Sequence, residues 1–191
     1  MIQDIANLGL LLELLPERAS SILSINSLAQ DLQVNFRTIS NWLDTFDQLY
    51  YSFRLSPYQS RKIASVRKEK KLYLWDWSSI SDESRRLENM IASHLLKFCH
   101  FLTDDDGWNV ELCYLRDSTG RETDFLVTLD KKPWFAVEVK LSDSQLSKNL
   151  LYFKEKLKIP LCYQIIGNMD LDVEKAGVRI MSAAKFINAL V

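Results

Sequence analysis

Hydrophobic and polar residues alternate most regularly in the second half of the chain, over two neighbouring segments. Residues 122–129 and 134–141 are both rich in β-branched and aromatic side chains, so each predicts a strand. Residues 130–133 between them are typical of a turn, and the three segments together predict a β-hairpin. Because side chains on a strand alternate between its faces, Glu138 and Lys140 share one face of the second strand.

The register of this hairpin decides whether Asp124 lies beside Glu138. A four-residue loop over 130–133 would place Asp124 opposite Val139, and therefore on the other face from Glu138. A site that uses both carboxylates requires a β-bulge or an odd-length loop. Carboxylates in an apolar hairpin are costly to bury unless something pairs with them, and a divalent cation would do so.

The first half of the chain has a helical period instead. Apolar residues recur at helical spacing over 5–15, and Pro16 is expected to end that helix. Residues 27–32 and 36–49 predict two further helices around a tight turn, with Asn35 as the N-cap of the second. Two short helices joined in this way are typical of a helix-turn-helix.

Strands over 50–55 and 71–75, with a basic loop between them, complete the pattern of a winged helix. The second helix of the helix-turn-helix exposes polar residues suited to groove or phosphate contacts, namely Asn35, Arg37, Thr38 and Asn41. The loop carries basic residues that would follow a phosphate backbone, namely Arg61, Lys62, Arg67 and Lys68. A solvated helix face and a solvated loop are the alternatives to DNA contact, because a formal net charge of -1 gives the molecule no overall basic field.

Small and polar residues over 78–84 indicate a boundary between a winged-helix domain (1–78) and a second domain (79–191). The second domain begins with a helix that carries Glu88 at the border of its apolar stripe. A strand over 110–116, the two hairpin strands and a helix with Ser142 and Asp143 as suitable caps follow. The buried strand 161–166, a last strand near 178–181 and a helix over 182–190 complete the chain. The chain as a whole therefore predicts an α/β (α+β) fold, with the order α-β-β-β-α-β in its second domain.

Composition narrows the class of protein. A hydrophobic content of 47% and a charged content of 26% are ordinary for a soluble globular protein. The three cysteines lack CxxC spacing, which favours free thiols in a reducing cytoplasm. No segment has the length of a membrane span and no GxxxxGK[ST] P-loop occurs, so we expect a cytoplasmic protein without a membrane partner. His94 and His100 lack the spacing of a ligand pair and are predicted to be structural.

An Asp followed by Glu-X-Lys on the next strand resembles the core motif of the PD-(D/E)XK nuclease-like superfamily. The resemblance implies Mg²⁺ (or Mn²⁺) held by Asp124, Glu138 and the carbonyl of Val139. It implies that Lys140 orients the attacking water or stabilises the charge that develops on the phosphate. It also implies that Glu88 assists from the first helix of the domain, where this superfamily often has a further acid.

The whole chain resembles the C-terminal region of AAA-type ATPases of bacteria and archaea, catalogued as domain of unknown function 4143. Matching positions run through its length: Leu28-Ala29, Thr38-Ile39, 55–58, 71–74 with Asp76, 87–89, 114–116, 122–125 and 138–140. The resemblance implies a winged helix fused to a restriction-endonuclease-like domain. It also implies an ATPase partner domain, which is absent from this chain.

Three functions are consistent with these patterns. The first is a Mg²⁺-dependent endonuclease or exonuclease, which the acids and the lysine of the motif favour. The second is a DNA-binding module without cleavage. The third is a protein-docking or regulatory domain of the ATPase, which the near-neutral charge favours over the second. Function depends on the site rather than on the fold, so the site's geometry must separate them.

Overall fold

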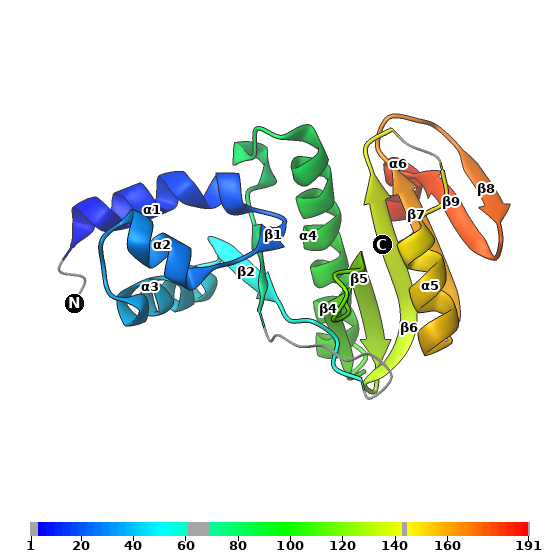
Figure 1. The fold of residues 1–191 in the computed structure, drawn as a ribbon. Coiled ribbons are helices and arrows are strands. Elements are labelled where there is room, and N and C mark those ends of the chain that lie inside the picture. The colour runs from blue at the N-terminus through cyan, green and yellow to red at the C-terminus, as the bar shows by residue number, and fades with distance from the viewer. Residues whose placement is uncertain (1–3, 61–68, 143–144, 191) are drawn as a thin grey trace.

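The computed structural model describes residues 4–60, 69–142 and 145–190, which form two packed units (Figure 1). The N-terminal unit contains α1 (Ile5–Arg18), β1 (Ser21–Ile22), α2 (Ile25–Asp31), α3 (Phe36–Gln48), β2 (Ser52–Leu55) and β3 (Lys71–Leu74). Its three strands form an antiparallel sheet in the order β1-β3-β2. This is the element order of a winged helix-turn-helix, as the sequence predicts.

Helix α3 forms where the polar and apolar pattern predicts it. Asn35 is its N-cap, and the Asn35 side chain accepts a hydrogen bond from the backbone N–H of Arg37 at 2.8 Å. The apolar face of the helix is buried through Ile39, Trp42 and Leu43. This face packs in one cluster with residues of α1, so the three helices share a single core.

The prediction that Pro16 ends the first helix is wrong, because α1 continues to Arg18 with Pro16 inside it. A proline in a helix has no N–H to donate to the carbonyl four residues earlier, which here belongs to Leu12. The Tyr51 hydroxyl donates to that carbonyl at 3.3 Å. A side chain from outside the helix therefore supplies the missing donor.

The C-terminal unit begins after the short 3-10 helix η1 (Trp77–Ser79). It contains α4 (Glu83–Asp104), β4 (Val110–Arg116), β5 (Glu122–Leu129), β6 (Lys132–Lys140), α5 (Lys148–Leu157), β7 (Leu161–Ile166), β8 (Asp172–Lys175), β9 (Val178–Ser182) and α6 (Ala183–Asn188). The predicted order α-β-β-β-α-β is present from α4 to β7. Where the sequence predicts one further strand near 178–181, the structure has the β8–β9 hairpin.

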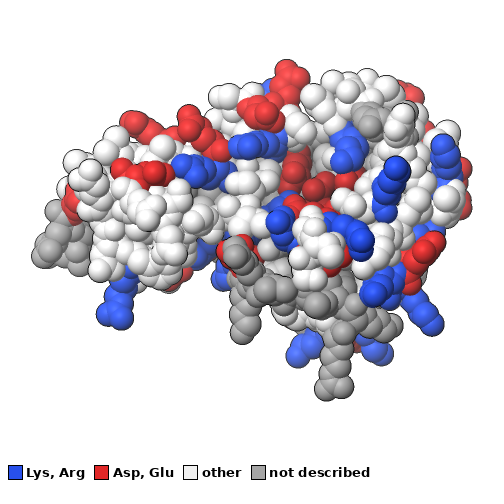
Figure 2. Space-filling view, in the orientation of Figure 1, with Lys and Arg blue, Asp and Glu red and all other residues white. Residues whose placement is uncertain are grey.

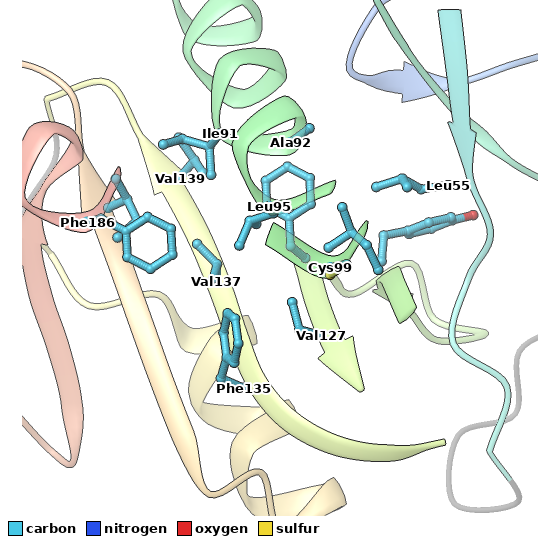
Figure 3. Packing of buried hydrophobic residues seen from close by; sticks show 14 of the residues in the cluster. Leu55, Ile91, Ala92, Leu95, Cys99, Val127, Phe135, Val137, Val139 and Phe186 are labelled. Atoms are coloured by element: carbon cyan, nitrogen blue, oxygen red, sulfur yellow. The ribbon is translucent and has the colours of Figure 1, made fainter. Parts of the chain in front are cut away.

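The six strands form one mixed sheet in the order β4-β5-β6-β7-β9-β8. Strands β4, β5 and β6 are antiparallel neighbours, whereas β7 is parallel to both β6 and β9. Helices α4 and α6 cover one face, where Ile91, Leu95 and Phe186 pack against Val137 and Val139 (Figure 3). Helix α5 covers the other face. Two helical layers therefore enclose the sheet that carries the predicted motif.

The two units share part of their interior along β3. Tyr73 is fully buried in the same cluster as Phe125 and the apolar face of α4. The fully buried Asn89 side chain accepts from the Leu74 N–H at 2.8 Å and donates to the Leu74 carbonyl at 2.6 Å. Strand β3 thus belongs to the winged-helix sheet and also packs on α4.

Candidate functional site

A β-bulge in the β5–β6 hairpin sets the register that the candidate site needs. The turn has only two residues, Asp130 and Lys131, rather than the predicted four, because Leu129 pairs with Lys132. The register then shifts by one residue between Val127 and Thr128. Beyond this bulge, Phe125 pairs with Val137.

Continuing the register past Phe125 and Val137 places Asp124 opposite Glu138, on the same face of the sheet. The residues two positions away, Leu126 and Ala136, pack with α5, which identifies the face. The Asp124 carboxylate also accepts a hydrogen bond from the Val139 N–H at 2.8 Å. The two acids of the predicted motif are therefore brought together by one extra residue in β6.

Glu138 is buried, and its two oxygens have different surroundings. Oε1 accepts from the Lys140 ammonium at 2.8 Å and from the Ser147 hydroxyl at 3.2 Å. Oε2 has no hydrogen-bond partner among the described residues. A buried carboxylate oxygen without a partner is costly, so a donor or a cation at Oε2 would be stabilising.

Ser147 has a second role, as the N-cap of α5, where its hydroxyl accepts from the Leu150 N–H. Its own N–H donates to the fully buried Gln164 side chain at 2.8 Å. Helix α5 is thus held beside Glu138 by side chains from β6 and β7. The caps predicted for this helix, Ser142 and Asp143, are not its caps, and Asp143 lies outside the described residues.

A buried lysine from the N-terminal unit enters the same cluster. The Lys71 side chain is 4% exposed, and its ammonium lies 2.7 Å from Glu122, 3.2 Å from Glu88 and 3.8 Å from Asp124. Glu88 comes from α4 and the other two acids from β5. Lys71 therefore joins a carboxylate of the helix that covers the sheet to two carboxylates of a strand within the sheet.

Burial and mutual repulsion make these acids hard to ionise. Burial, followed by the charge of Asp124, raises the pKa of Glu88 to about 8, although Lys71 and the Tyr73 hydroxyl act in the opposite direction. The same two causes raise the pKa of Glu138 to about 7, against the effect of Lys140. Burial also raises the pKa of Asp124, and Lys71 opposes this rise. Strong perturbation of several acids in one place is typical of functional sites.

The pKa of Lys71 moves in the direction that preserves its charge. Burial alone would lower it, but Glu88, Asp124 and Glu122 raise it above the ordinary value by a larger amount. Lys71 is therefore a permanent cation within the acidic cluster. Figure 2 shows acidic side chains gathered in a hollow near the middle of this face, with basic side chains around it.

The donor set fits a magnesium-type ion. Mg²⁺ is usually held by one or two carboxylates and keeps several waters, and Asp124, Glu138 and the Val139 carbonyl make such a set. Oε2 of Glu138, which has no hydrogen-bond partner among the described residues, would be available to such an ion. As the side chains stand, no group of three or more His, Cys, Asp and Glu within the described ranges could hold a metal ion. Lys71 already lies against Glu88 and Glu122, which would be the further carboxylates.

The predicted DNA-contacting residues of α3 lie together on its exposed side. Asn35, Arg37 and Asn41 are exposed and Thr38 is half-buried. With Phe36 they line a shallow surface depression of about 590 Å³. The predicted loop residues Arg61, Lys62, Arg67 and Lys68 lie outside the described part of the chain.

Sequence reasoning missed Lys71, Glu122 and Tyr73 as members of the acidic cluster. Lys71 and Tyr73 are two residues apart on β3, and both side chains donate hydrogen bonds to Glu88. The period-two pattern of a strand could therefore have placed them on one face. Nothing local predicts that this face meets α4 and β5, because that contact crosses the predicted domain boundary. Glu122 could have been found, since it lies two residues before Asp124 on the same strand.

Two family comparisons match the chain. Residues 84–186 match the family described as Domain of unknown function (DUF4143), which covers more than half of the chain. The chain therefore belongs to this family. Residues 1–81 match a second family, described as Domain of unknown function (DUF8612). Searches of curated proteins and of solved structures gave no match.

The two matches meet between residues 81 and 84, a few residues after the boundary predicted at 78. They divide the chain just ahead of α4, which begins at Glu83. Lys71 thus falls in the first matched region, whereas the acids it contacts fall in the second. Within the described ranges, no helix is long and apolar enough to span a membrane.

Proposed function

We propose that the chain is a metal-dependent nuclease-like module that hydrolyses phosphodiester bonds in nucleic acid. The observation that carries the proposal is the bulged register, which brings Asp124 opposite Glu138 while Oε2 of Glu138 stays without a partner. Buried acids are costly to ionise without a cation beside them, and a divalent cation at this position would activate water and offset charge on a phosphate.

Asp124, Glu138 and the Val139 carbonyl would hold Mg²⁺ or Mn²⁺ in this proposal. When bound, the ion supplies Lewis-acid activation of water and offsets charge on the phosphate. The Asp124 carboxylate is oriented by the Val139 N–H, and Glu138 is oriented by Ser147. Lys140 is 38% exposed at the rim of the cluster, where its ammonium would meet a phosphate oxygen or the attacking water.

The winged helix would deliver DNA to this site. Arg37 and Asn41 are exposed on α3, the helix that lies in the groove in helix-turn-helix proteins. As the family resemblance implies, the module would act behind an ATPase domain. The cysteine pattern and the sequence's lack of a membrane-length segment favour the cytoplasm. The partners proposed for it are therefore duplex DNA and that ATPase.

A non-catalytic role, in DNA binding or protein docking, is the second candidate. It is favoured by Lys71, because an ammonium already neutralises part of the carboxylate cluster without any metal. In this role the acids and lysines would be a structural ion network that joins the two units.

Calorimetric titration with Mn²⁺, followed by incubation with plasmid and linear duplex DNA, separates the two candidates. We expect saturable binding by the wild type, at least tenfold weaker binding by Asp124→Asn and Glu138→Gln, and cleavage by the wild type alone. Glu111→Gln, which removes an exposed carboxylate on β4, is the matched control and should bind as the wild type does. Binding that is the same in all four proteins, or absent from the wild type, would contradict the metal site.

A further inference from the structure

We infer that Lys71 is a positioning residue of the candidate metal site, an internal cation that competes with a divalent ion for the Asp124 carboxylate. This inference rests on the metal binding proposed above and adds a residue from the other unit to it. The competing charge comes from β3, the strand that forms the centre of the winged-helix sheet. It would link ion binding by the acids to the packing of the winged helix.

The contacts of Lys71 identify its ammonium as an internal counter-ion of the acids rather than as a solvated group. Its ammonium is within ion-pair distance of Glu88 on α4 and of Glu122 and Asp124 on β5. The ammonium also lies 5.7 Å from the centre of the Tyr114 ring. An ammonium at the meeting point of these carboxylates supplies positive charge beside the position proposed for the divalent ion.

One acid beside Lys71, Asp124, is shared with the candidate metal site. Asp124 touches Lys71 through Oδ1 and the Val139 N–H through Oδ2. Glu88 has its Oε1 fully engaged, since it accepts from both Lys71 and the Tyr73 hydroxyl. An ion bound to Asp124 would therefore be within a few ångströms of a positive charge, and the two would repel each other.

Repulsion at this distance has a predictable sign. Removing the charge of Lys71 should tighten binding of a divalent ion, because the carboxylates lose the cation that now neutralises them. Removing it should also destabilise the ion-free protein, because buried acids are left unpaired. Added ion should reverse that loss, since binding to the folded state alone stabilises it. A lysine with only a packing role would produce the destabilisation without the tighter binding.

The test compares Lys71→Met with Lys71→Arg, which keeps the charge, and with Arg116→Met. Arg116 is the matched control because its guanidinium lies 2.6 Å from Glu122 at the rim and its side chain is 42% exposed. Mn²⁺ affinity is measured by calorimetry, and thermal unfolding is followed with and without saturating Mn²⁺. We expect Lys71→Met to bind Mn²⁺ about tenfold or more tightly than the wild type, and to gain a larger rise in melting temperature from the ion.

We expect Lys71→Arg and Arg116→Met to bind Mn²⁺ within about threefold of the wild type, because the central charge remains. Equal tightening in Arg116→Met would reduce the effect to net charge and overturn the inference. So would a Lys71→Met protein that binds no better than a wild type that does bind, or that stays unfolded at saturating Mn²⁺. If neither the wild type nor Lys71→Met binds the ion, the proposed function fails first, and the inference fails with it.

Discussion

Single residues decide the electrostatics of this protein more than its composition does. The formal net charge is -1, yet Glu88, Glu138 and Asp124 all have raised pKa values because they are buried together. Not every buried or bonded acid behaves in this way. Asp117, in the turn between β4 and β5, has a lowered pKa and so shows the opposite coupling between ionisation and folding.

Asp117 gives a prediction for pH dependence. Burial raises the pKa of Asp117, but hydrogen bonds from Thr119 and from the Arg121 N–H at 3.0 Å together lower it by more. The pKa of Asp117 is therefore below its ordinary value. A group with a lowered pKa in the folded state stabilises the protein above its unfolded pKa, about 3.9, and loses that contribution as the pH falls through its folded value. Asp117→Asn should therefore cost about 1 kcal/mol at pH 6 and progressively less towards pH 3.

Urea unfolding of the wild type and Asp117→Asn at several pH values measures this difference. Asp106→Asn, which removes an exposed carboxylate from the loop before β4, is the matched control. A cost for Asp117→Asn that stays constant from pH 6 to pH 3 would show that the carboxylate charge has no part in the turn.

At the scale of elements, the β5–β6 hairpin carries the candidate site, and its geometry depends on a strained turn. Asp130 and Lys131 have φ values of 50° and 62°, the left-handed conformation that a two-residue hairpin turn requires at both positions. Lysine adopts the left-handed conformation at a cost in free energy, whereas glycine adopts it without that cost. The strain is accepted because the shorter turn, together with the bulge, gives the register that joins Asp124 and Glu138.

Lys131→Gly should therefore stabilise the protein by about 0.5 to 1 kcal/mol, the strain relieved less the added freedom of the unfolded chain. Lys132→Gly is the matched control, because Lys132 is also exposed but lies at the start of β6, where glycine should destabilise. The free energy of unfolding in urea measures both. The same sign for the two variants would mean that turn strain does not limit the hairpin.

The elements of the fold were largely predictable from the sequence, because hydrophobic periodicity is local. The strands 110–116 and 161–166 have the predicted bounds, and α3 begins one residue after its predicted cap. The features that were missed depend on distant contacts. Helix α1 continues through Pro16 because the Tyr51 hydroxyl supplies the missing donor. The sequence around Pro16 does not predict this contact with Tyr51.

The candidate site was predictable in part for the same reason. Asp124 and Glu138 were identified as carboxylates in an apolar hairpin, and the need for a bulge or an odd-length loop followed from counting residues. The position of the bulge, between Val127 and Thr128, could not be read from a sequence in which no glycine marks it. The place of Lys71 in the acidic cluster could not be predicted, because its partners are more than fifteen residues away in the sequence.

At the scale of the whole molecule, the winged helix and the sheet unit place two different surfaces on one body. The polar face of α3 carries Arg37 and Asn41, and the acidic cluster lies in the other unit. DNA would have to reach from the first to the second in the proposed function. Its affinity should therefore depend on α3 even when cleavage is blocked.

Arg37→Ala and Asn41→Ala should each weaken binding to a 20-base-pair duplex, measured by fluorescence anisotropy in Ca²⁺ without cleavage. For Arg37→Ala, the slope of log affinity against log salt should fall by about one, as expected when one phosphate contact is lost. Lys175→Ala is the matched control, since Lys175 is exposed on β8 at the edge strand of the larger sheet. Duplex binding that responds equally to Arg37→Ala and Lys175→Ala would remove α3 from the interface.

The two hydrogen bonds between the Asn89 amide and the Leu74 backbone have a practical consequence for expressing the C-terminal unit alone. A piece starting at the linker after residue 78 would take Asn89 without its partner, and Glu88 without Tyr73 and Lys71. Removal of Tyr73 would also uncover the apolar surface of Phe125 and α4, which would be expected to lower solubility and yield. A recombinant C-terminal half should carry β3 with it, so cloning limits are better chosen by this shared strand than by where the two family matches meet.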